Sequence, residues 1–488
     1  MPRIHSWETL LNGGDYDVVL CQPVLTLRIQ YDEQEPIVKN YFETQSNVNA
    51  GLLGDDPYEP NNGLLQLAAD LRVRGYSVCV LDFHMLDVWW RRKHRGMLRD
   101  DVIKNVIARF RYRLLGISTI CVAEKAAAFL AQVSKEIYPE SQVVAGGLLP
   151  NAIPSLLKER YPAFDELVVG DGLDSICRRI NSGKTMSLSS ADFSKRAFDL
   201  VPAEMPLVPR VTVQRGCALK CAFCSPIRMQ HRAVGDKLGT GQHAIEIVDE
   251  IKSLRDIYNT KFFVMGDLSF LANSSLDEAV CYQLEKQNLG VDFWCQMRPD
   301  CVTAERAQRL KKSGCVQVAI GIENTNRETL RIHQKSYRLP MVDNHLDYSS
   351  VLTILREAGL STYGYFIIGL PGDTEADVLN TIEFMSKLFA EDLLDAAHIS
   401  VPVAYPGTPW YDNPEHFGIK IRHHDFSNYW MNSDPLGYSV PMMDTDHLKA
   451  ERIYELWLYA LKRVTAHYEK RLAKSRVTRL FNVINCQT

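Results

Sequence analysis

The chain has 488 residues, of which 46% are hydrophobic and 23% charged, and its formal net charge is −4. This composition is typical of a globular protein of roughly two or three domains, and the small negative charge gives no reason to expect nucleic acid or an anionic membrane as a partner. The first residues contain no apolar core of the kind that a signal peptide needs, and no apolar run approaches the roughly 20 residues that span a bilayer. The twelve cysteines are scattered except for one triplet, which argues against a disulfide framework and predicts a reducing compartment, the cytoplasm.

The first part of the chain alternates apolar runs with helical patterns, which predicts a series of strands and helices. The predicted strands are residues 16–22, 77–82, 112–118, 142–146 and 166–170. Runs that are apolar without alternation belong to sheets covered on both faces, and such sheets are usually parallel. We therefore predict a Rossmann-like or flavodoxin-like α/β domain over residues 1–180, with any ligand at the carboxyl ends of its strands. Residues 181–208, which contain several serines and prolines, are predicted to be an interdomain linker.

Several glycines of this first domain lie after predicted strands or inside the first turn of a helix. They are Gly63, Gly146, Gly147 and Gly170. A glycine at such a position lets a ligand approach the backbone closely, because it has no Cβ. A tight turn between a strand and a helix would need glycine as well, so the pattern alone leaves both interpretations open.

Three cysteines, Cys217, Cys221 and Cys224, follow a short β-branched run that predicts a strand, so they lie on the loop that leaves it. Three thiolates on one short loop suit a soft metal or an iron–sulfur cluster. A structural zinc site would need a fourth ligand, usually another Cys or His pair, and no such pair follows closely. The spacing therefore favours a cluster in which one iron keeps a position for a non-protein ligand, with zinc as the alternative.

From residue 209 a second alternating pattern begins. Its first strand ends at the cysteine loop, and the following ones are predicted over residues 261–266, 291–297, 316–320, 363–368 and 397–403. Thr374-x-x-Asp377 predicts a capping box that opens a helix over residues 374–390. Six β/α units in succession predict a partial (β/α)6 barrel over residues 209–410, with its chemistry at the carboxyl ends of the strands. Residues 411–488 are predicted to be mainly helical, with an apolar stripe on helix 446–472 that packs over the open side of the barrel.

The cysteine spacing, with Arg215 and Gly216 before it and Phe223 before the last cysteine, resembles that of the radical S-adenosylmethionine (radical SAM) enzymes. In that family three cysteines hold a [4Fe–4S] cluster, and the open iron binds the amino and carboxylate groups of S-adenosylmethionine. Reductive cleavage of that molecule then gives a 5′-deoxyadenosyl radical. The resemblance thus implies both cofactors here, together with an electron donor such as flavodoxin or ferredoxin.

The predicted strand ends of the second domain also resemble motifs of this family. The resemblance assigns S-adenosylmethionine binding to Phe223, Gly266, Asp267, Arg298, Glu323, Asn324 and Gly369. Each match is weak alone, because the turn at Gly369 is ordinary loop chemistry and Glu323 could be a solvated acid. Matches in register on successive strand ends are much more specific. One position departs from the family, since Asp373 stands where glutamate is commoner.

The first domain resembles the cobalamin-binding domains that precede many radical SAM domains. The resemblance rests on residues 60–69, 143–147 and 168–172, and it assigns possible cobalamin contacts to Gly63, Gly146, Gly147 and Gly170. A histidine motif that ligates cobalt in another cobalamin family is not matched, because Asp87 replaces its final glycine and the segment with His84 follows the second strand instead of the first. The resemblance implies a cobalamin-dependent methyltransferase that acts on an unactivated carbon of a small-molecule, natural-product or peptide substrate.

Two alternatives remain open. A radical SAM enzyme that does not methylate, with or without bound cobalamin, would catalyse a cyclisation, rearrangement, epimerisation or carbon–carbon coupling. In that case Cys295 would be a candidate hydrogen donor, although a buried inert thiol explains this residue as well. The remote alternative is a non-catalytic zinc-binding scaffold. The sequence itself does not name the substrate.

Overall fold

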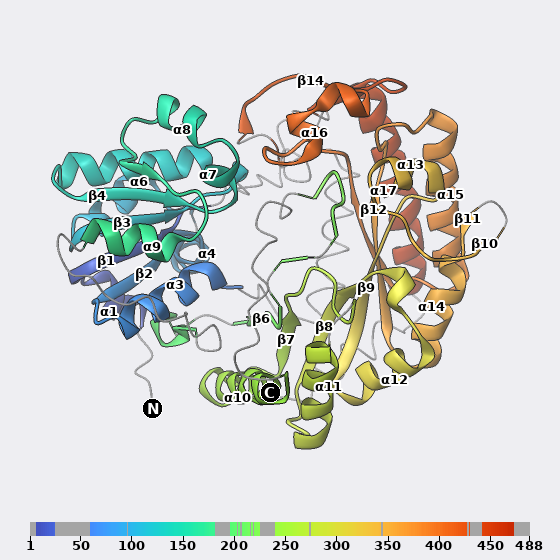
Figure 1. The fold of residues 1–488 in the computed structure, drawn as a ribbon, viewed down its shortest axis with the longest axis horizontal. Helices are drawn as coiled ribbons and strands as arrows, with labels where there is room; N and C mark the ends of the chain where they lie inside the picture. Colours follow the sequence, from blue (N-terminus) through green and yellow to red (C-terminus); the bar gives the residue numbers. More distant parts are fainter. Residues whose placement is uncertain are drawn as a thin grey trace. The chain divides into compact units, whose positions relative to one another are not determined.

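The computed structural model describes residues 6–24, 59–94, 96–180, 196–202, 204, 207–214, 216–217, 219–224, 240–272, 275–342, 345–426, 429 and 442–472. The chain divides into two compact units, which are described separately (Figure 1). Unit 1 comprises Met1–Arg28 and Tyr58–Leu207, and unit 2 comprises Ile29–Pro57 and Val208–Thr488. Residues 181–195 of the predicted linker lie outside the described ranges. Within these ranges, no helix has the length and hydrophobicity needed to cross a bilayer.

Unit 1 contains a five-stranded sheet in the order β2-β1-β3-β4-β5, in which all paired strands run parallel. The strands are β1 (Gly14–Gln22), β2 (Val78–Asp82), β3 (Phe110–Ser118), β4 (Gln142–Gly146) and β5 (Glu166–Leu167). The predicted parallel α/β domain is confirmed, and its strand order is the flavodoxin-like one. In this order the chain reverses direction across the sheet between β1 and β3, and ligands of such folds bind at the carboxyl ends of the strands at this switch point.

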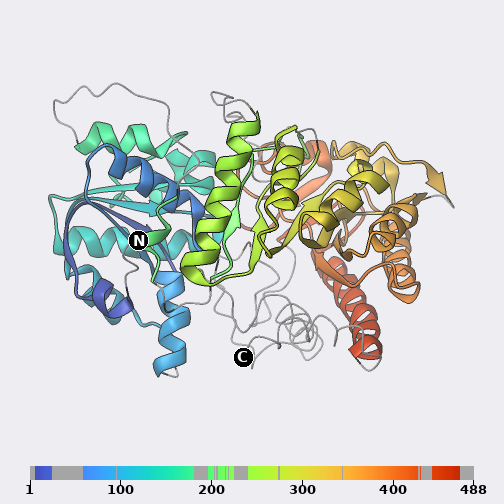
Figure 2. The same cartoon turned by 90° about the horizontal axis from the view of Figure 1, so that it is seen from below.

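Helices lie on both faces of the unit 1 sheet (Figures 1 and 2). They are α1 (Trp7–Leu11), α3 (Asn62–Val73), α4 (Phe83–His94), α5 (Asp100–Ile107), α6 (Glu124–Ile137), α7 (Leu148–Ala152), α8 (Pro154–Arg160) and α9 (Gly172–Ile180), with short 3-10 turns at Cys121–Ala123 and Phe198–Leu200. This double cover explains why the strands are apolar throughout: Val18, Val19, Leu20 and Cys21 of β1 are all fully buried.

Unit 2 contains a six-stranded parallel sheet in the order β13-β12-β9-β8-β7-β6. The strands are β6 (Arg210–Val211), β7 (Phe262–Met265), β8 (Asp292–Met297), β9 (Cys315–Glu323), β12 (Ser361–Ile367) and β13 (Ala396–Ser400). Neighbouring strands follow one another in chain order, and β6 and β13 form the two edges. This is the topology of a (β/α) barrel that stays open between its first and last strand, so the predicted partial barrel is confirmed.

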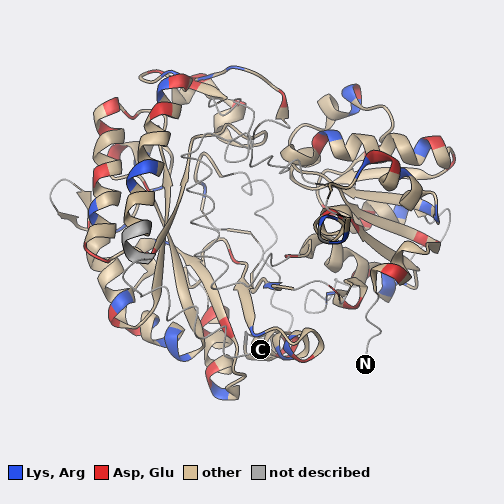
Figure 3. Cartoon of the chain, turned by 180° about the vertical axis from the view of Figure 1, so that it is seen from behind, with Lys and Arg blue, Asp and Glu red and all other residues tan. Residues whose placement is uncertain are grey.

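The helices and minor strands of unit 2 connect these strands. They are α10 (Thr240–Tyr258), α11 (Ser275–Gln287), α12 (Ala304–Lys312), α13 (Arg327–Ile332), α14 (Tyr348–Glu357), α15 (Glu375–Ala390), α16 (Pro409–Asp412) and α17 (Ala450–Leu472), the hairpin β10 (Met341–Val342) and β11 (His345–Leu346), the pair β14 (Ile419–Ile421) and β15 (Met443–Thr445), and 3-10 turns at Pro299–Cys301 and Pro414–Phe417. The predicted capping box is present at the start of α15, where the side chains of Thr374 and Asp377 each accept from the other's backbone N–H. Figure 3 shows that charged residues lie mainly on the helices, while the strands are largely uncharged.

The two faces of the unit 2 sheet differ in burial. Along β8 and β12, partly exposed and buried residues alternate without exception. The buried face contacts the helices, since Cys295 of β8 interacts with Cys281 of α11. The helices α11, α12, α14 and α15 all lie on this side of the sheet (Figure 1). The partly exposed residues, which include Trp294, Tyr363 and Tyr365, therefore lie on the concave face of the open barrel.

Helix α17 covers the free edge of β13. The backbone N–H of Ala397 donates to the hydroxyl of Tyr468 at 2.8 Å, and the indole N–H of Trp457 donates to the carbonyl of Ile399 at 2.9 Å. Side chains of the helix thus satisfy backbone groups that an edge strand otherwise leaves unpaired. The predicted apolar stripe of this helix is fully buried at Ile453, Leu456, Trp457, Leu461 and Val464.

Candidate functional site

The segment between β6 and the cysteine loop is held by Asp267, which follows β7. The Asp267 carboxylate accepts hydrogen bonds from the backbone N–H groups of Val213 at 3.0 Å and Gln214 at 2.7 Å. Burial, together with the nearby Asp277, raises the pKa of Asp267 to about 7. Because both carboxylate oxygens bind the backbone of the segment that leads into the loop, Asp267 fixes where the loop begins.

The cysteine loop is then fixed at its centre by two distant segments. The backbone N–H of Ala222 donates to the carbonyl of His333 at 2.9 Å, and the N–H of Trp410 donates to the carbonyl of Ala222 at 3.4 Å. These bonds join the loop to the segment after α13 and to α16. Such contacts come from parts of the chain far apart in sequence, so the loop is held by the whole carboxyl edge of the barrel.

The three thiols of this loop lie close enough to act on one another electrostatically. Burial raises the pKa of Cys221, and burial followed by the charge of Cys221 raises the pKa of Cys224 to about 12; the charge of Cys217 adds to both increases. A thiolate is the form that binds metal, and a cation or metal nearby is what offsets the cost of a buried thiolate. Deprotonation of Cys221 and Cys224 therefore needs positive charge close to them.

No group of three His, Cys, Asp or Glu side chains within the described residues is placed to hold a single metal ion. A mononuclear tetrahedral site would require thiolate sulfurs about 3.8 Å apart, which follows from a metal–sulfur distance of about 2.3 Å. In a [4Fe–4S] cluster each cysteine binds a different iron, so the sulfurs are spread more widely. Three thiols on one loop are the donor set that a cluster with one open iron uses.

An aromatic group built on His333 lies behind the cysteine loop. The indole N–H of Trp410 donates to Nδ1 of His333 at 3.0 Å, and Nε2 of His333 lies 2.7 Å from the carbonyl oxygen of Pro371. Because an indole can only donate, Nδ1 must be the acceptor, and Nε2 carries the proton. Burial lowers the pKa of His333 to about 4, which keeps the ring neutral. The ring of Phe223 packs 5.5 Å from that of Trp410, so this predicted cofactor residue is anchored in the same group.

Lys335 and Glu323 form an ion pair beside the loop. Their side chains are only 12% and 10% exposed, and the ammonium of Lys335 lies 5.3 Å above the ring of Phe223. Burial alone would lower the pKa of Lys335, but Glu323 and the nearby Cys221 outweigh burial and raise it. A Cβ at Gly321 would lie 2.8 Å from Oε1 of Glu323, so a larger residue at this position would make the end of that side chain shift.

The carboxyl end of β9 contains a strained turn. Glu323 has a φ of 63°, and the backbone N–H of Asn324 donates to the carbonyl of Ile322 at 2.8 Å. A bond between residues two apart around a positive φ is the rarer and less stable form of γ-turn. Non-glycine residues in such conformations cluster at ligand sites, where the surrounding structure holds them. The strained turn therefore makes Glu323 a candidate for a ligand contact, as the sequence predicts.

Asn324 is held in place by Asp373, which follows β12. The Asn324 amide donates to Asp373 at 2.7 Å, its carbonyl accepts from the N–H of Asn326 at 2.6 Å, and the hydroxyl of Thr329 donates to Asp373 at 2.8 Å. Asp373 is fully buried, which raises its pKa to about 7. The Asn324 side chain is thus engaged within the protein at both of its ends.

Arg298, after β8, is held from three sides. It makes two hydrogen bonds of 2.8 Å to the carboxylate of Asp300 and one of 2.6 Å to the carbonyl of Ser336, and its guanidinium lies 4.7 Å above the ring of Tyr337. The Tyr337 hydroxyl donates to the carbonyl of Gly321. The charges of Arg298 and Glu323 both act on Cys221, so the structure brings these two predicted residues together with the loop.

Two of the predicted glycines have packing roles in the structure. A Cβ at Gly266 would lie 2.7 Å from Cδ of Arg210. Gly369 has a φ of 83°, and a Cβ there would lie 3.0 Å from the side chain of Ile453 on α17. Both positions need glycine for reasons of space in the protein itself, whatever they contact in addition.

Cys295 lies on the helix-facing side of β8. It is fully buried with Cys281 and Cys315, and burial raises its pKa well above the ordinary value. Its neighbours on the concave face, Trp294 and Gln296, point the other way because side chains alternate along a strand. This position corresponds to a packed core thiol.

The concave face carries a group of rings near the carboxyl ends of β12 and β13. Tyr365 lies 5.4 Å from Tyr363 and 6.0 Å from His398, measured between ring centroids, and burial lowers the pKa of His398 to about 4. Tyr365 pairs in register with Gly321 of β9 and with His398 of β13. The row thus combines two phenols and a neutral imidazole, and at Gly321 it borders the Glu323–Lys335 pair.

In unit 1, Asn61 bridges the switch point of the sheet. Its amide donates to the side chains of Gln22, at the end of β1, and Ser118, at the end of β3, the latter at 3.1 Å. Its carbonyl oxygen accepts from the N–H of Leu64 at 3.1 Å, which caps α3. The ends of β1 and β3 therefore present neutral, hydrogen-bonding groups, while the neighbouring β2 ends at the buried carboxylate of Asp82.

The loop after β4 approaches the end of β3 closely. Gly147 has a φ of 111°, and a Cβ there would lie 2.7 Å from the carbonyl oxygen of Thr119. Gly146 meets only Val168 at 3.8 Å, and no atom lies within 4 Å of a Cβ on Gly170. The hydroxyl of Thr119 is buried and has no hydrogen-bond partner among the residues that the structure describes. Such an orphaned group at a ligand edge is what a bound cofactor would satisfy.

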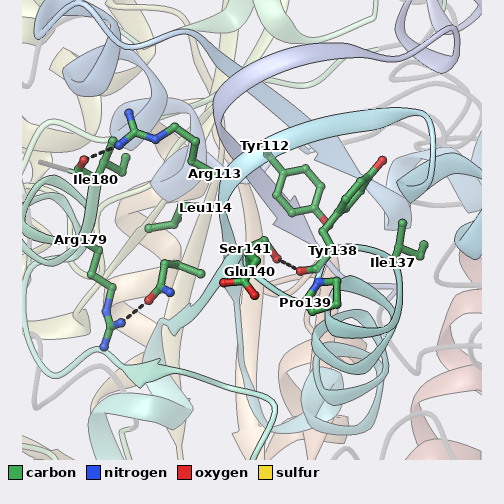
Figure 4. Close-up of a pocket in the computed structure, with 11 residues that line it drawn as sticks. Tyr112, Arg113, Leu114, Ile137, Tyr138, Pro139, Glu140, Ser141, Arg179 and Ile180 are labelled. Atoms are coloured by element: carbon green, nitrogen blue, oxygen red, sulfur yellow. Dashed lines mark hydrogen bonds between the residues drawn. The ribbon is translucent and has the colours of Figure 1, made fainter. Parts of the chain in front are cut away.

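A cavity of about 540 Å³ lies at the opposite end of the unit 1 sheet (Figure 4). Its lining includes Tyr112 and Arg113 at the start of β3 and Gln142 at the start of β4. Arg113 donates to the carbonyl of Ile180 at 2.6 Å, and Arg179 pairs with Glu166. The charged groups are thus engaged within the protein, and the cavity lies away from the carboxyl ends.

The sequence analysis missed Lys335, His333, Trp410 and Thr119 as parts of these sites. The first two follow α13 in a segment without periodicity. The turn before Trp410 and the end of the strand before Thr119 were the signals that could have pointed to the other two residues.

Comparison with known proteins shows what this chain is similar to. Residues 211–385 match the model of the radical SAM superfamily. An uncharacterized methyltransferase from Pyrococcus horikoshii is 24% identical over 338 residues, which cover 63% of this chain and 70% of the relative. The anaerobic magnesium-protoporphyrin IX monomethyl ester cyclase of Rubrivivax gelatinosus is 23% identical over 444 residues, covering 83% and 72%. The methyltransferase TsrM from Kitasatospora setae, solved with cobalamin and a [4Fe–4S] cluster, superposes with a TM-score of 0.59 at 15% identity over 91% of this chain and 89% of TsrM.

Proposed function

We propose that this radical SAM enzyme is a cobalamin-dependent methyltransferase that acts on a carbon of a small-molecule or peptide substrate. The observation that carries the proposal is the combination of two sites in one chain. One is a loop of three thiols at the carboxyl edge of an open barrel, and the other is a flavodoxin-like sheet whose switch point holds an orphaned hydroxyl. The fold likeness to TsrM extends over both units, which supports reading the two sites as one enzyme.

In unit 2, Cys217, Cys221 and Cys224 would hold the [4Fe–4S] cluster. Asp267 positions the stem of their loop, and the bonds of Ala222 fix its centre. We assign direct contact with S-adenosylmethionine to Glu323 and Arg298, whose charges reach Cys221. Asn324 would act indirectly: its hydrogen bond to Asp373 would hold the turn that contains Glu323.

In unit 1, the residues that would contact cobalamin are Thr119, Gly146, Gly147 and Gly170, at the ends of β3, β4 and β5, and Gly63 at the start of α3. Gly147 allows the backbone of its loop to approach Thr119, and Asn151 bridges the two loops by bonding the carbonyl of Gly147 and the N–H of Gly170. When bound, the cluster would supply the electron for S-adenosylmethionine cleavage and cobalamin would supply the methyl group.

The substrate would lie on the concave face of the barrel. Tyr363, Tyr365 and His398 are partly exposed there, and Tyr365 pairs in register with Gly321 of β9. Burial keeps His398 neutral, so it can both donate and accept a hydrogen bond without adding charge. These groups suit a substrate part that is uncharged and offers a flat face or hydrogen-bonding atoms.

A second candidate function is a cyclisation without methyl transfer. It is favoured by the relative named as a cyclase, which matches 83% of this chain. The same cluster-binding loop would serve it, and the two candidates differ in the product and in the fate of the methyl group.

The proposal is tested by anaerobic reconstitution of the full chain with iron, sulfide and hydroxocobalamin, followed by desalting, metal analysis and an absorption spectrum. About four irons and close to one cobalt per chain are expected. The reconstituted protein is then incubated with S-adenosylmethionine carrying an isotopically labelled methyl group, a reductant and candidate substrates. Label in a product supports methyl transfer. Iron without retained cobalt would overturn the cobalamin assignment and leave the cyclisation candidate.

A further inference from the structure

The hydroxyl of Tyr348 bonds the backbone on both sides of Glu323. Tyr348 is the first residue of α14, and its hydroxyl donates to the carbonyl of Asn324 at 3.1 Å and to that of Ile322 at 3.3 Å. The same carbonyl of Ile322 accepts from the N–H of Asn324 at 2.8 Å, which closes the strained turn. One side chain therefore bonds both carbonyls that flank Glu323.

Packing in the core fixes the ring that carries this hydroxyl. Tyr348 is fully buried. Its ring lies 6.2 Å from that of Tyr337 and 6.0 Å from that of Phe384 of α15, measured between ring centroids. The hydroxyl of Tyr337 in turn donates to the carbonyl of Gly321, earlier on the same strand. Because the interior is closely packed, the Tyr348 hydroxyl acts on the turn from a nearly fixed point.

Glu323 needs support because its backbone conformation is unfavourable in itself. It has a φ of 63°, and a residue with a Cβ persists in such a conformation only when its surroundings hold it there. Lys335 pairs with the carboxylate of Glu323, but this contact holds only the end of the side chain. The bond between Asn324 and Asp373 holds the next side chain along. The Tyr348 hydroxyl adds bonds to the backbone of the turn.

We propose that Tyr348 is a positioning residue, whose hydroxyl holds Glu323 in the conformation from which its side chain contacts S-adenosylmethionine. The inference rests on the proposed function, which assigns that contact to Glu323. Tyr348 is fully buried and acts through the turn. When only a fraction of the protein has the binding conformation, the affinity for a ligand falls by that fraction. Loss of the hydroxyl should therefore weaken the binding of S-adenosylmethionine.

The first test is the affinity of the reconstituted full chain for S-adenosylmethionine, measured by anaerobic equilibrium dialysis. Tyr348→Phe removes only the hydroxyl and is expected to weaken binding about three- to tenfold at unchanged iron content. Glu323→Gln is expected to weaken it about tenfold or more, because a charged contact is lost. Since Tyr348 acts through Glu323, the double variant Tyr348→Phe/Glu323→Gln should bind no more than about twofold more weakly than Glu323→Gln.

A second measurement reports on the turn in the absence of S-adenosylmethionine. The N–H of Asn324 closes the turn, and its hydrogen exchange is followed by mass spectrometry. This exchange is expected to be about tenfold faster in Tyr348→Phe, because the turn opens more often. Tyr468→Phe is the matched control, since its hydroxyl is also buried and accepts from the backbone N–H of Ala397 at 2.8 Å. It should change neither the affinity nor this exchange, even where it lowers the free energy of unfolding.

A milder variant covers the case in which Tyr348→Phe does not fold. Phe384→Leu keeps the hydroxyl and loosens the packing of the ring that carries it. It is expected to shift both measurements in the same direction as Tyr348→Phe, by a smaller factor.

The outcomes separate this inference from the proposed function. Unchanged exchange at Asn324 and unchanged affinity in Tyr348→Phe would overturn the inference and leave the proposed function intact. Additive losses of affinity in the double variant would also overturn it, because Tyr348 would then act by another route. A Glu323→Gln protein that binds S-adenosylmethionine like the wild type would instead overturn the contact that the proposed function assigns to Glu323.

Discussion

The two units use the same kind of parallel sheet but prepare its carboxyl edge in opposite ways. At the switch point of unit 1 the side chains of Asn61, Gln22, Ser118 and Thr119 offer amides and hydroxyls, and the neighbouring strand β2 ends at one buried carboxylate, Asp82. The corresponding edge of unit 2 carries buried charged or titratable groups, among them Asp267, Glu323, Lys335 and Asp373.

This difference indicates what each edge is built to hold. Burying an ionisable group costs free energy unless it is paired or hydrogen-bonded, so a fold keeps such groups where they serve a ligand. Unit 2 retains them around three thiols, where charge and electron transfer are expected. Unit 1 instead combines close backbone approach with amide and hydroxyl groups and one buried carboxylate at the end of β2, which suits a large ligand held mainly by its shape and by hydrogen bonds. The experiments below sharpen this contrast, beginning with the largest expected effect.

Removal of one thiol should abolish the chemistry of unit 2 and leave unit 1 intact. Cys224→Ala is expected to reduce retained iron by more than half and to lower S-adenosylmethionine cleavage below detection, because each cysteine binds its own iron. Retained cobalamin should stay unchanged. Cys177→Ser, a partly exposed cysteine of α9 in unit 1, is the control and should keep its iron. A Cys224→Ala protein with full iron content would contradict the assignment.

Gly147→Ala should have the opposite effect: it should destabilise unit 1 and leave the cluster of unit 2 in place. Its φ of 111° and the carbonyl oxygen of Thr119 at 2.7 Å leave no room for a Cβ. The free energy of unfolding of unit 1 is expected to fall by about 2 to 3 kcal/mol, with loss of cobalamin retention.

The neighbouring Gly146→Ala is the matched control for this change. A Cβ there meets only Val168, at an ordinary distance of 3.8 Å, so the free energy of unfolding should change by less than about 0.5 kcal/mol. Denaturant unfolding followed by far-UV circular dichroism measures both. If the free energy of unfolding fell equally in the two variants, the close approach of Thr119 would not be the reason that position 147 requires glycine.

The buried acids of unit 2 should make its stability depend on pH. Burial raises the pKa of Asp373 to about 7 in the folded state, whereas an unfolded aspartate titrates near 3.9. Its stabilising contribution is therefore complete below about pH 4 and is lost as the pH rises through about 7. Asp373→Asn is expected to remove up to about 1 kcal/mol per pH unit from this slope.

Asp377→Asn is the control for the pH experiment. Burial would raise the pKa of Asp377, but hydrogen bonds from Thr374 outweigh burial and lower it. The contribution of Asp377 is therefore present above about pH 4 and is lost only in acid, so its variant should not alter the slope between pH 5 and 8. The test is to measure the free energy of unfolding of the variants at several pH values. If Asp373→Asn keeps the wild-type slope of this free energy against pH, the assignment of the pH dependence to Asp373 is contradicted.

The sequence predicted both sheets because their strands are continuous apolar runs separated by helical patterns. It also predicted the thiols of the loop, since their spacing is local. It could not separate Gly146 from Gly147, which look alike in sequence and differ only in φ and in the distance to Thr119.

Residues that act through distant contacts were beyond the reach of any local pattern. The tautomer of His333 depends on Trp410, which lies 77 residues away, and the position of Lys335 depends on Glu323, Phe223 and Gly321 together. Cys295 illustrates the same limit, because the alternation of β8 says that Cys295 and Gln296 face opposite sides but not which side carries the helices.

The smallest expected effect is also the one that best separates binding from folding in unit 1. The hydroxyl of Thr119 is buried without a partner, so Thr119→Val removes an unsatisfied polar group and keeps the shape. In the absence of cobalamin the free energy of unfolding should stay the same or rise by up to about 1 kcal/mol. Cobalamin affinity, measured by equilibrium dialysis, should instead fall about three- to tenfold, as expected for one neutral hydrogen bond. Thr119→Ser keeps the hydroxyl and should keep most of the affinity. If Thr119 only packed in the core, its replacement would not raise the free energy of unfolding and weaken cobalamin binding at the same time. A Thr119→Val protein that is less stable and binds cobalamin like the wild type would instead show that the hydroxyl serves the fold.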